Sequence, residues 1–454
     1  EICACLVGSE MCIRDRFETI KNAFGTKEIR VKIWATLLLL LVYRIGCFVP
    51  VPGLNVSVIS QALEQSSAAS FLNVISAITG GSLSQGTLFA LGIIPFINSF
   101  IIMQLLTLII PKLEEMSKDG EEGRKKITQI TRYVAIVLGA IQAIGIAFMW
   151  KNYIDPIYGM QKNWLAMIYV IVILVGGSVM VMWLGERITE YGIGNGTSLI
   201  IFVGILSTAG TSLLNAFRTV PTDPNKLWNI FGFLILVVAL FAFIVFMDGG
   251  ERRITVQYAK QVKGNKMYGG QTTFIPIRVN ASGVMPIIFA SSFIMFPQMI
   301  ISFIPKLAES KFGVWWMRNL TTSGGTWWGS LIYYIFLVVF IIFFAYFYSM
   351  IQFNPEDVSK NIQQYGGFIP GIRPGKPTSD YLKRINNRIT LFGAIFLSII
   401  CVIPTFLFNV IGKDIGLSSA FSATGLLIVV SVALEFNKSL ESQIMMRHYK
   451  GFLK

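Results

Sequence analysis

Ten apolar segments, each long enough to cross a lipid bilayer as a helix, recur along this chain of 454 residues. A spanning helix needs about 20 consecutive apolar residues. Because lipid offers backbone amides and carbonyls no hydrogen-bond partner, a spanning segment is a helix or part of a closed barrel. The sequence therefore predicts an all-α integral membrane protein with ten transmembrane helices, centred on residues 31–49, 88–110, 133–150, 164–184, 199–214, 227–247, 284–304, 327–351, 389–407 and 417–433.

The composition excludes a soluble protein. Hydrophobic residues make up 54% of the chain and charged residues 14%, whereas roughly a quarter of the residues in soluble domains are charged. So few charged side chains cannot cover the apolar surface of this chain in water, and no soluble domain of any size separates the apolar segments.

Lysine and arginine predict the orientation. With the N-terminus inside, 29 of the 38 basic residues lie in cytoplasmic segments and eight lie outside, with Arg44 inside the first helix. Cytoplasmic loops of membrane proteins carry the excess of basic residues. We therefore expect a multi-pass protein of a bacterial cytoplasmic membrane with both termini in the cytoplasm.

Ten helices divide into two sets of five, and the odd number makes the second set start on the opposite side of the membrane. This geometry permits two inverted, pseudo-symmetric halves. We predict an N-terminal half at residues 17–217, a C-terminal half at 218–437 and a cytoplasmic tail at 438–454. Residues 1–16 lack an apolar stretch, and we expect a tail that is disordered or not native to the protein.

The reactive side chains are scarce, which argues against an enzyme. His448 is the single histidine, and no two of the five cysteines form a C-x-x-C pair. We expect no metal, no cofactor and no catalytic residue. Two function classes remain: a channel, and a secondary transporter of small solutes. The transporter is disfavoured because such proteins usually hold carboxylates in mid-membrane, whereas Arg44 is the only clear charge within a helix.

Three cytoplasmic loops, at residues 111–132, 249–279 and 352–388, are long and basic. Basic loops suit an acidic partner such as ribosomal RNA or an acidic protein. The alternative interpretation is that these charges only fix the topology.

Several motifs resemble those of the SecY family, from about Glu18 to the C-terminus. They occur in order and at the predicted helix boundaries, which makes the set specific although each motif alone is weak. In chain order they include Tyr43-Arg-Ile-Gly46, Val49-Pro-Val-Pro-Gly53, Phe71-Leu-Asn73, Gly80-Gly-Ser-Leu83, Phe89-Ala-Leu-Gly-Ile-Ile-Pro95, Gly120-Glu-Glu-Gly-Arg-Lys-Lys-Ile127, Gly185-Glu-Arg-Ile-Thr-Glu-Tyr-Gly-Ile-Gly-Asn-Gly196, Arg252-Arg-Ile-Thr-Val-Gln-Tyr-Ala-Lys260, Val279-Asn-Ala-Ser-Gly-Val-Met-Pro286 and Gly371-Ile-Arg-Pro-Gly375.

This resemblance implies the central, pore-forming subunit of a channel that translocates unfolded preproteins and inserts membrane proteins. The helices would surround an hourglass-shaped pore, and SecA or the ribosome would drive the passive channel. The implied partners are SecE, SecG, the SecA ATPase, the ribosome, preproteins with signal sequences and membrane lipids.

The resemblance also assigns roles to individual residues. A constriction ring maps to Ile93, Ile97, Thr197, Ile201, Ile288 and Ile428. Thr197 departs from the aliphatic residue common in the family, which puts its part in the ring in doubt. A plug maps to residues 70–84, with Phe71, Leu72, Asn73, Gly80 and Gly81. Without the resemblance, an ordinary external loop would be the better interpretation of that segment.

Two further sets of residues follow from the resemblance. Gln104 and Asn280 match polar positions of a lateral gate, although static helix–helix hydrogen bonding would explain them equally well. The cytoplasmic loops would contact SecA or the ribosome through Arg252, Arg253, Lys260, Lys263, Lys266 and Arg373. Asn265-Lys266 stands where some relatives have two arginines, so contact at that turn is less secure than at Arg373.

The charge distribution gives a first testable prediction. A reporter enzyme that is active only outside the membrane should be active when fused within residues 151–162 or 306–318. It should be inactive when fused within residues 118–126 or at Arg373. Activity at either of the latter positions would contradict the ten-helix topology.

Overall fold

The computed structural model describes residues 27–54, 76, 79–150, 163–219, 226–258, 261–263, 266–268, 272–280, 283, 285–303, 307, 310–320, 327–411 and 423–451. The chain divides into two compact units. Unit 1 comprises Glu1–Asn215 and Val432–Lys454, and unit 2 comprises Ala216–Ser431.

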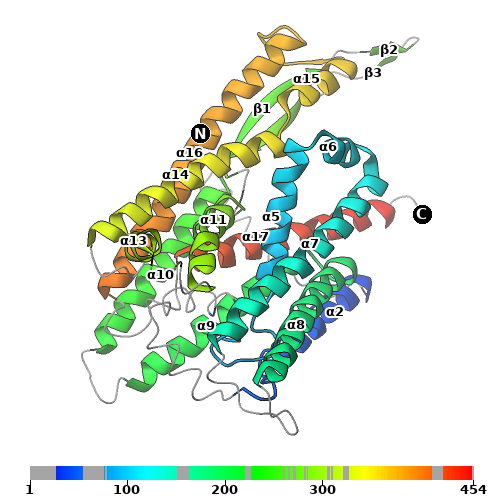
Figure 1. The fold of residues 1–454 in the computed structure, drawn as a ribbon. Coiled ribbons are helices and arrows are strands. Elements are labelled where there is room, and N and C mark those ends of the chain that lie inside the picture. The colour runs from blue at the N-terminus through cyan, green and yellow to red at the C-terminus, as the bar shows by residue number, and fades with distance from the viewer. Residues whose placement is uncertain are drawn as a thin grey trace. The chain divides into compact units, whose positions relative to one another are not determined.

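Long helices dominate both units (Figure 1). Unit 1 contains helices α2, α5, α6, α7 and α8, most of α9 and the C-terminal part of α17. Their bounds are Lys27–Gly46, Ile94–Ile109, Pro111–Lys118, Gly120–Met149, Asn163–Tyr191, Gly196–Thr219 and Ala423–Gly451. Unit 2 contains helices α10, α11, α13, α14, α15 and α16. Their bounds are Lys226–Asp248, Met285–Phe303, Lys311–Asn319, Trp327–Gln352, Pro355–Gln364 and Lys376–Ile411.

Every predicted transmembrane segment coincides with one of these helices over much of its length. Within the described ranges, six helical stretches are long and apolar enough to cross a membrane, or seven if the bent pair α5 and α6 forms one span. Helix α2 is less apolar because Arg30, Lys32 and Arg44 fall within its 20 residues. The structure thus establishes a multi-pass helical protein.

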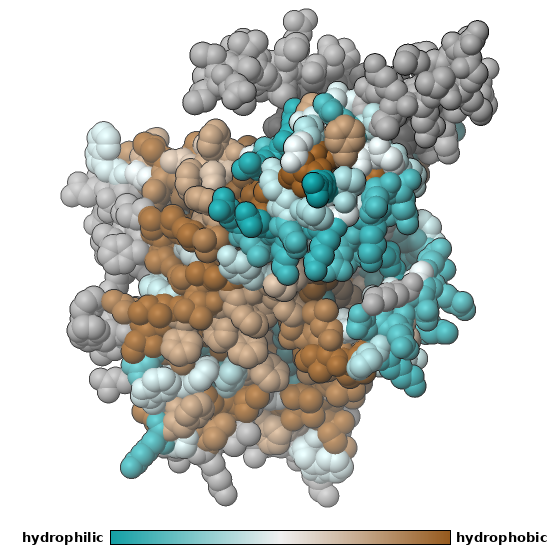
Figure 2. Space-filling view, turned by 90° about the horizontal axis from the view of Figure 1, so that it is seen from above, coloured by the Kyte–Doolittle hydropathy of each residue, from teal (hydrophilic) through white to brown (hydrophobic). Residues whose placement is uncertain are grey.

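Apolar side chains cover much of the face shown in Figure 2, and hydrophilic side chains gather in one region of it. Helix α10 illustrates the apolar surface. Trp228, Ile235 and Phe246 are 78%, 69% and 78% exposed, respectively. Large apolar side chains so exposed on a long helix suit contact with lipid.

Two of the predicted cytoplasmic loops are partly helical. The first loop forms α6 and the start of α7, which reverse direction at Gly120 (φ +74°). An added Cβ at Gly123 would lie 1.8 Å from the carbonyl oxygen of Met116, so the two helices pack closely there. Helix α16 begins at Lys376, well before the predicted membrane segment at residue 389.

A small β-sheet also stands where the sequence predicts only loops, so the all-α description applies to the membrane segments alone. Strand β1 (Glu251–Tyr258) pairs antiparallel with β4 (Thr272–Arg278), and β5 (Gly367–Phe368) pairs with the other edge of β1. Between β1 and β4, strands β2 (Gln261–Lys263) and β3 (Lys266–Tyr268) form a separate hairpin.

The three-stranded sheet packs on α15 and α16 through an apolar core. Alternate residues of the strands point into that core, as expected for a sheet with one buried face. The buried members are Ile254, Val256, Ile277, Ile362, Ile369, Leu382, Ile385 and Ile389. The sheet is therefore packed against the N-terminal part of α16 (Figure 1).

Candidate functional site

Two predicted ring residues of unit 1 converge on one glycine of α8. A Cβ added to Gly185 would lie 3.4 Å from Cγ2 of Thr197 and 3.5 Å from Cδ1 of Ile93. Ile93 is the residue before α5 and is 3% exposed, and Ile201 on α9 is 6% exposed. Ile97, one turn after Ile93, is half-buried. Unit 1 thus gathers an apolar cluster from the starts of α5 and α9.

The hydroxyl group of Thr197 is engaged within its own turn. Oδ1 of Asn195 accepts hydrogen bonds from the backbone N–H of Thr197 at 3.1 Å and from its Oγ1 at 2.7 Å. Asn195 thereby acts as the N-cap of α9. With its oxygen bonded locally, Thr197 presents its methyl group to the neighbourhood of Gly185. The threonine therefore adds an apolar surface at this position, as an aliphatic side chain would.

The turn between α8 and α9 brings the two backbones into contact. An added Cβ at Gly196 would lie 2.0 Å from the carbonyl oxygen of Gly185, so a larger residue does not fit. The N–H of Gly196 donates to Oγ1 of Thr189 at 2.9 Å, and the N–H of Ile193 donates to Oγ1 of Thr36 at 3.2 Å. Side-chain oxygens thus satisfy backbone groups that the turn leaves outside a helix.

The segment at residues 79–92 includes the end of the predicted plug, residues 79–84, and is hydrogen-bonded to the chain that follows α2. The N–H of Val51 donates to the carbonyl of Gly86 at 3.0 Å, and the N–H of Leu88 donates to the carbonyl of Val49 at 2.9 Å. Phe89 stacks on Tyr43 with ring centroids 5.9 Å apart. The predicted plug residues Phe71, Leu72 and Asn73 lie outside the described residues.

The two predicted ring residues of unit 2 occupy separate helices. Ile288 lies in the first turn of α11 and is half-buried, and Ile428 lies in α17 and is 8% exposed.

Each predicted gate residue has a buried side-chain oxygen. Asn280, 7% exposed, donates from Nδ2 to Oδ1 of Asp248 at 3.1 Å, within unit 2. Because a carboxylate only accepts hydrogen bonds, this contact orients the Asn280 amide. Among the described residues, Oδ1 of Asn280 and Oε1 of Gln104 have no hydrogen-bond partner. Asp248 is a contact that the sequence did not predict.

Arg373 is exposed on a loop with a defined backbone. Gly371 and Gly375 have φ of +83° and +100°, a region that favours glycine. Oγ1 of Thr378 donates to the carbonyl of Arg373 at 2.8 Å, and Oγ of Ser359 donates to the carbonyl of Gly375 at 2.8 Å. Ile369 is buried in the core under the sheet. The loop therefore presents Arg373 from a rigid base.

The other predicted contact residues lie on or near the sheet. Arg252 and Arg253 are exposed on β1, and Arg253 forms an ion pair with Glu251 at 2.7 Å. The backbones of Lys263 and Lys266 are paired in the register of β2 and β3, and Lys260 lies outside the described residues.

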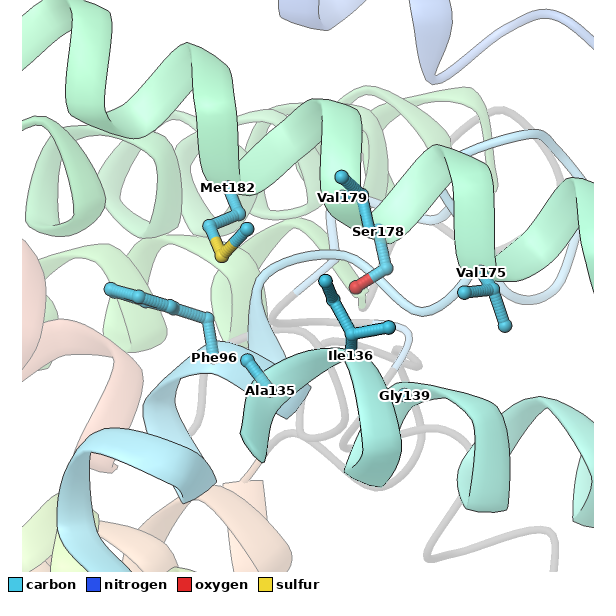
Figure 3. Close-up of a pocket in the computed structure, with 8 residues that line it drawn as sticks. All are labelled: Phe96, Ala135, Ile136, Gly139, Val175, Ser178, Val179 and Met182. Carbon is cyan, nitrogen blue, oxygen red and sulfur yellow. The ribbon is translucent and has the colours of Figure 1, made fainter. Parts of the chain in front are cut away.

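A small pocket, with room for no more than about one water molecule, lies between α8, α5 and α7 in unit 1. Figure 3 shows Val175, Ser178, Val179 and Met182 of α8 opposite Phe96 of α5 and Ala135, Ile136 and Gly139 of α7. The hydroxyl of Ser178 is the only side-chain polar group in this lining.

Comparison with known proteins shows which family the chain resembles. The family model described as SecY matches residues 87–437. The chain is 39% identical to the protein translocase subunit SecY of Staphylococcus epidermidis, across 96% of this chain and 99% of that protein. It is 40% identical to the subunit of the same name from Bacillus subtilis, across 96% of this chain and 100% of that protein.

Solved structures share the fold. One described as a protein conducting channel has a TM-score of 0.66 at 21% identity, covering 91% of this chain and 92% of that one. Sec61 in a canine ribosome–channel complex has a TM-score of 0.63 at 19% identity, with the same coverage.

Proposed function

The chain belongs to the SecY family of protein translocase subunits, and from this premise we infer that it forms the channel through which unfolded preproteins cross the membrane. The observation that carries this function is the identity of about 39% over nearly the whole length of both proteins. Membership in a family of channel subunits supports a passive role without catalysis. It also favours the channel over the solute transporter.

We propose that the channel is closed by a ring of six side chains, of which five are aliphatic and the sixth is Thr197: Ile93, Ile97, Thr197, Ile201, Ile288 and Ile428. A narrow ring of this kind excludes water and ions, yet its side chains can move apart around an extended peptide. The apolar cluster at Gly185 supports the unit 1 part of this proposal, and the local hydrogen bond of Thr197 supports its inclusion.

We further propose that residues 70–84 act as a plug and that Gln104 and Asn280 belong to a lateral gate. Their buried oxygens without a described partner support the gate, because such an atom gains a hydrogen bond when a donor arrives. The ten-helix topology, the two inverted halves at 17–217 and 218–437, and the cytoplasmic termini belong to the same proposal.

The partners are proposed from the family and from the cytoplasmic surface. Arg373 on its rigid loop, together with the exposed Arg252 and Arg253, suits an acidic docking surface on SecA or the ribosome. One structural neighbour is Sec61 in a ribosome–channel complex, which supports the ribosome as a partner. SecE and SecG are proposed as the subunits that accompany this chain, SecA or translation as its energy source, and preproteins and membrane lipids as its other partners.

The ring proposal is tested by Ile428→Asn. An amide in the ring binds water, so the closed state should lose stability relative to the open state. We expect at least a tenfold rise in resting ion conductance of vesicles, which corresponds to about 1.4 kcal/mol, together with export of a signal-defective precursor. Ile235→Asn, the same change at an exposed position of α10, is the matched control. Wild-type conductance and export in a normally abundant Ile428→Asn protein would contradict the ring.

The bond between Asn195 and Thr197 gives a second test. Asn195→Ala should free the Thr197 hydroxyl and raise resting conductance, whereas Thr197→Val should not. The double variant should return to the wild-type level, because no hydroxyl remains to bind water. Loss of the helix cap costs about 0.5–2 kcal/mol in both variants that lack Asn195. Conductance that stays high in the double variant would therefore assign the effect to the cap.

Charge reversal tests the docking contact. Arg373→Glu should reduce SecA-driven export at least tenfold, because a like charge would face an acidic surface. Arg384→Glu makes the same change at an exposed position of α16 and serves as the control. Both proteins should accumulate normally, since the loop backbone is held by Thr378 and Ser359. Normal export by Arg373→Glu would remove Arg373 from the contact surface.

A further inference from the structure

Arg132 and Glu186 form an ion pair between two helices of unit 1. Nε of Arg132 on α7 donates to Oε1 of Glu186 on α8 at 2.6 Å, and the two side chains are 43% and 26% exposed. Arg132 directly precedes the predicted membrane segment at 133–150, and Glu186 lies two residues after the one at 164–184. A charge-assisted hydrogen bond of this length is stronger than one between neutral groups. The pair therefore joins α7 to α8 at one end of their apolar segments.

The residue before Arg132 joins α7 to a third helix. Oγ of Ser99 on α5 donates to the carbonyl of Thr131 at 2.6 Å, and both residues are buried. Because Thr131 and Arg132 are consecutive, one short stretch of α7 is bonded to both α5 and α8. These four residues, Ser99, Thr131, Arg132 and Glu186, are here called the brace.

The α8 end of the brace is adjacent to the apolar cluster of unit 1. Glu186 follows Gly185, and a Cβ added to that glycine would lie 3.5 Å from Ile93 and 3.4 Å from Thr197. The carbonyl of Gly185 also accepts a hydrogen bond from Oγ1 of Thr189 at 2.9 Å. A shift of Glu186 therefore moves the glycine on which two proposed ring residues converge.

The α5 end of the brace lies on the helix that carries two other ring positions. Ser99 follows Ile97 by two residues and Ile93, the residue before α5, by six. A helix rises about 1.5 Å per residue, so Ser99 lies roughly 9 Å along α5 from Ile93. Over so short a length a helix moves as one body. A shift of Ser99 therefore moves both isoleucines.

Arg44, near the end of α2, is bonded differently. Its Nη1 lies 3.5 Å from the carbonyl oxygen of Gly80, and its Nη2 donates to Oγ of Ser207 on α9. Its guanidinium carbon lies 5.2 Å from the ring centroid of Phe48. These partners are neutral. Separating the ion pair of the brace instead opposes the attraction between two opposite charges, so the brace holds its helices more firmly.

We propose that Arg132 and Glu186 are positioning residues that set the spacing between α5 and the start of α9 and thereby keep the resting channel closed. The proposal rests on the ring proposed above, because it assigns to the pair an effect on how Ile93 and Thr197 meet at Gly185. It adds two charged residues, outside the ring, on which the closure of the ring depends.

Charge exchange tests the pair in vesicles that contain the complete translocase. Arg132→Glu and Glu186→Arg each place like charges opposite one another. Resting ion conductance should rise about fivefold in each, less than for a change in the ring itself, because water screens a partly exposed pair. The double variant restores opposite charges and should return to within about twofold of the wild type. Export of a signal-defective precursor should follow the same order.

A second ion pair on α8 provides the matched control. Arg187 and Glu190 lie 2.7 Å apart and belong to the same helix. Arg187→Glu and Glu190→Arg, singly and together, should leave conductance at the wild-type level. Arg132→Lys keeps the charge of the brace and should also stay close to the wild type, which separates loss of the ion pair from loss of the arginine.

Ser99→Ala tests the other bond of the brace without changing a charge. Conductance should rise about threefold, as expected for the loss of one hydrogen bond. Ser398→Ala is its control, because Oγ of Ser398 is buried and donates at 2.8 Å to the carbonyl of Ala394 within its own helix, α16. Ser99→Ala combined with Arg132→Glu should give less than the product of their separate fold-changes, because both loosen α5 from α8.

The outcomes separate this inference from the proposed function. If Ile428→Asn raises conductance while Arg132→Glu and Glu186→Arg do not, the ring stands and the brace is wrong. A charge-exchanged double variant that conducts as strongly as the single variants would also overturn it. If the charge variants do not accumulate in the membrane, the two serine variants decide alone, and equal conductance of Ser99→Ala and Ser398→Ala would reject the brace.

Discussion

Every backbone amide and carbonyl group inside the membrane needs a hydrogen-bond partner from the protein, and the rest of this structure follows from that need. The long helices meet it internally. Where the chain leaves helical geometry between apolar helices, side-chain oxygens supply the hydrogen-bond partners instead. Thr36 and Thr189 accept from the turn before α9, and Ser82 and Thr87 donate within the segment before α5. These hydroxyl groups make non-helical backbone possible beside the proposed ring.

The same requirement explains why glycines stand at the closest backbone contacts. Gly196 approaches the carbonyl of Gly185, and Gly80 approaches Gly204 and the Arg44 guanidinium. A Cβ does not fit at Gly196, and at Gly80 it would require Arg44 and Gly204 to shift. Gly196 thus lies at a close contact between two helices, whereas Gly80 lies in a turn that packs against a cation.

Much of the helical fold could be predicted from the sequence because apolar length is a local property. The sheet was missed although β1 and β4 alternate, with Ile254, Val256 and Ile277 on one face. That signal was masked by the arginines beside it. The site residues were harder to predict from the sequence. An isoleucine such as Ile93 looks like any membrane residue, and its neighbours come from distant helices. The partners of Arg44 are 36 and 163 residues away, so no local pattern could reveal them.

The polar contacts fall into two classes with different consequences for movement. Arg132 and Glu186 join α7 to α8 by a charged hydrogen bond of 2.6 Å, and breaking such a pair separates two charges. By contrast, Thr197 bonds to a neutral amide and Arg44 to neutral dipoles. A channel that opens and closes needs closed-state contacts whose loss is small enough for a passing peptide to offset. Thr197 and Arg44 have neutral partners, whereas an ion pair joins the packed helices α7 and α8. The rigidity of unit 1 and the mobility required of its pore residues are therefore compatible, because different kinds of contact provide them.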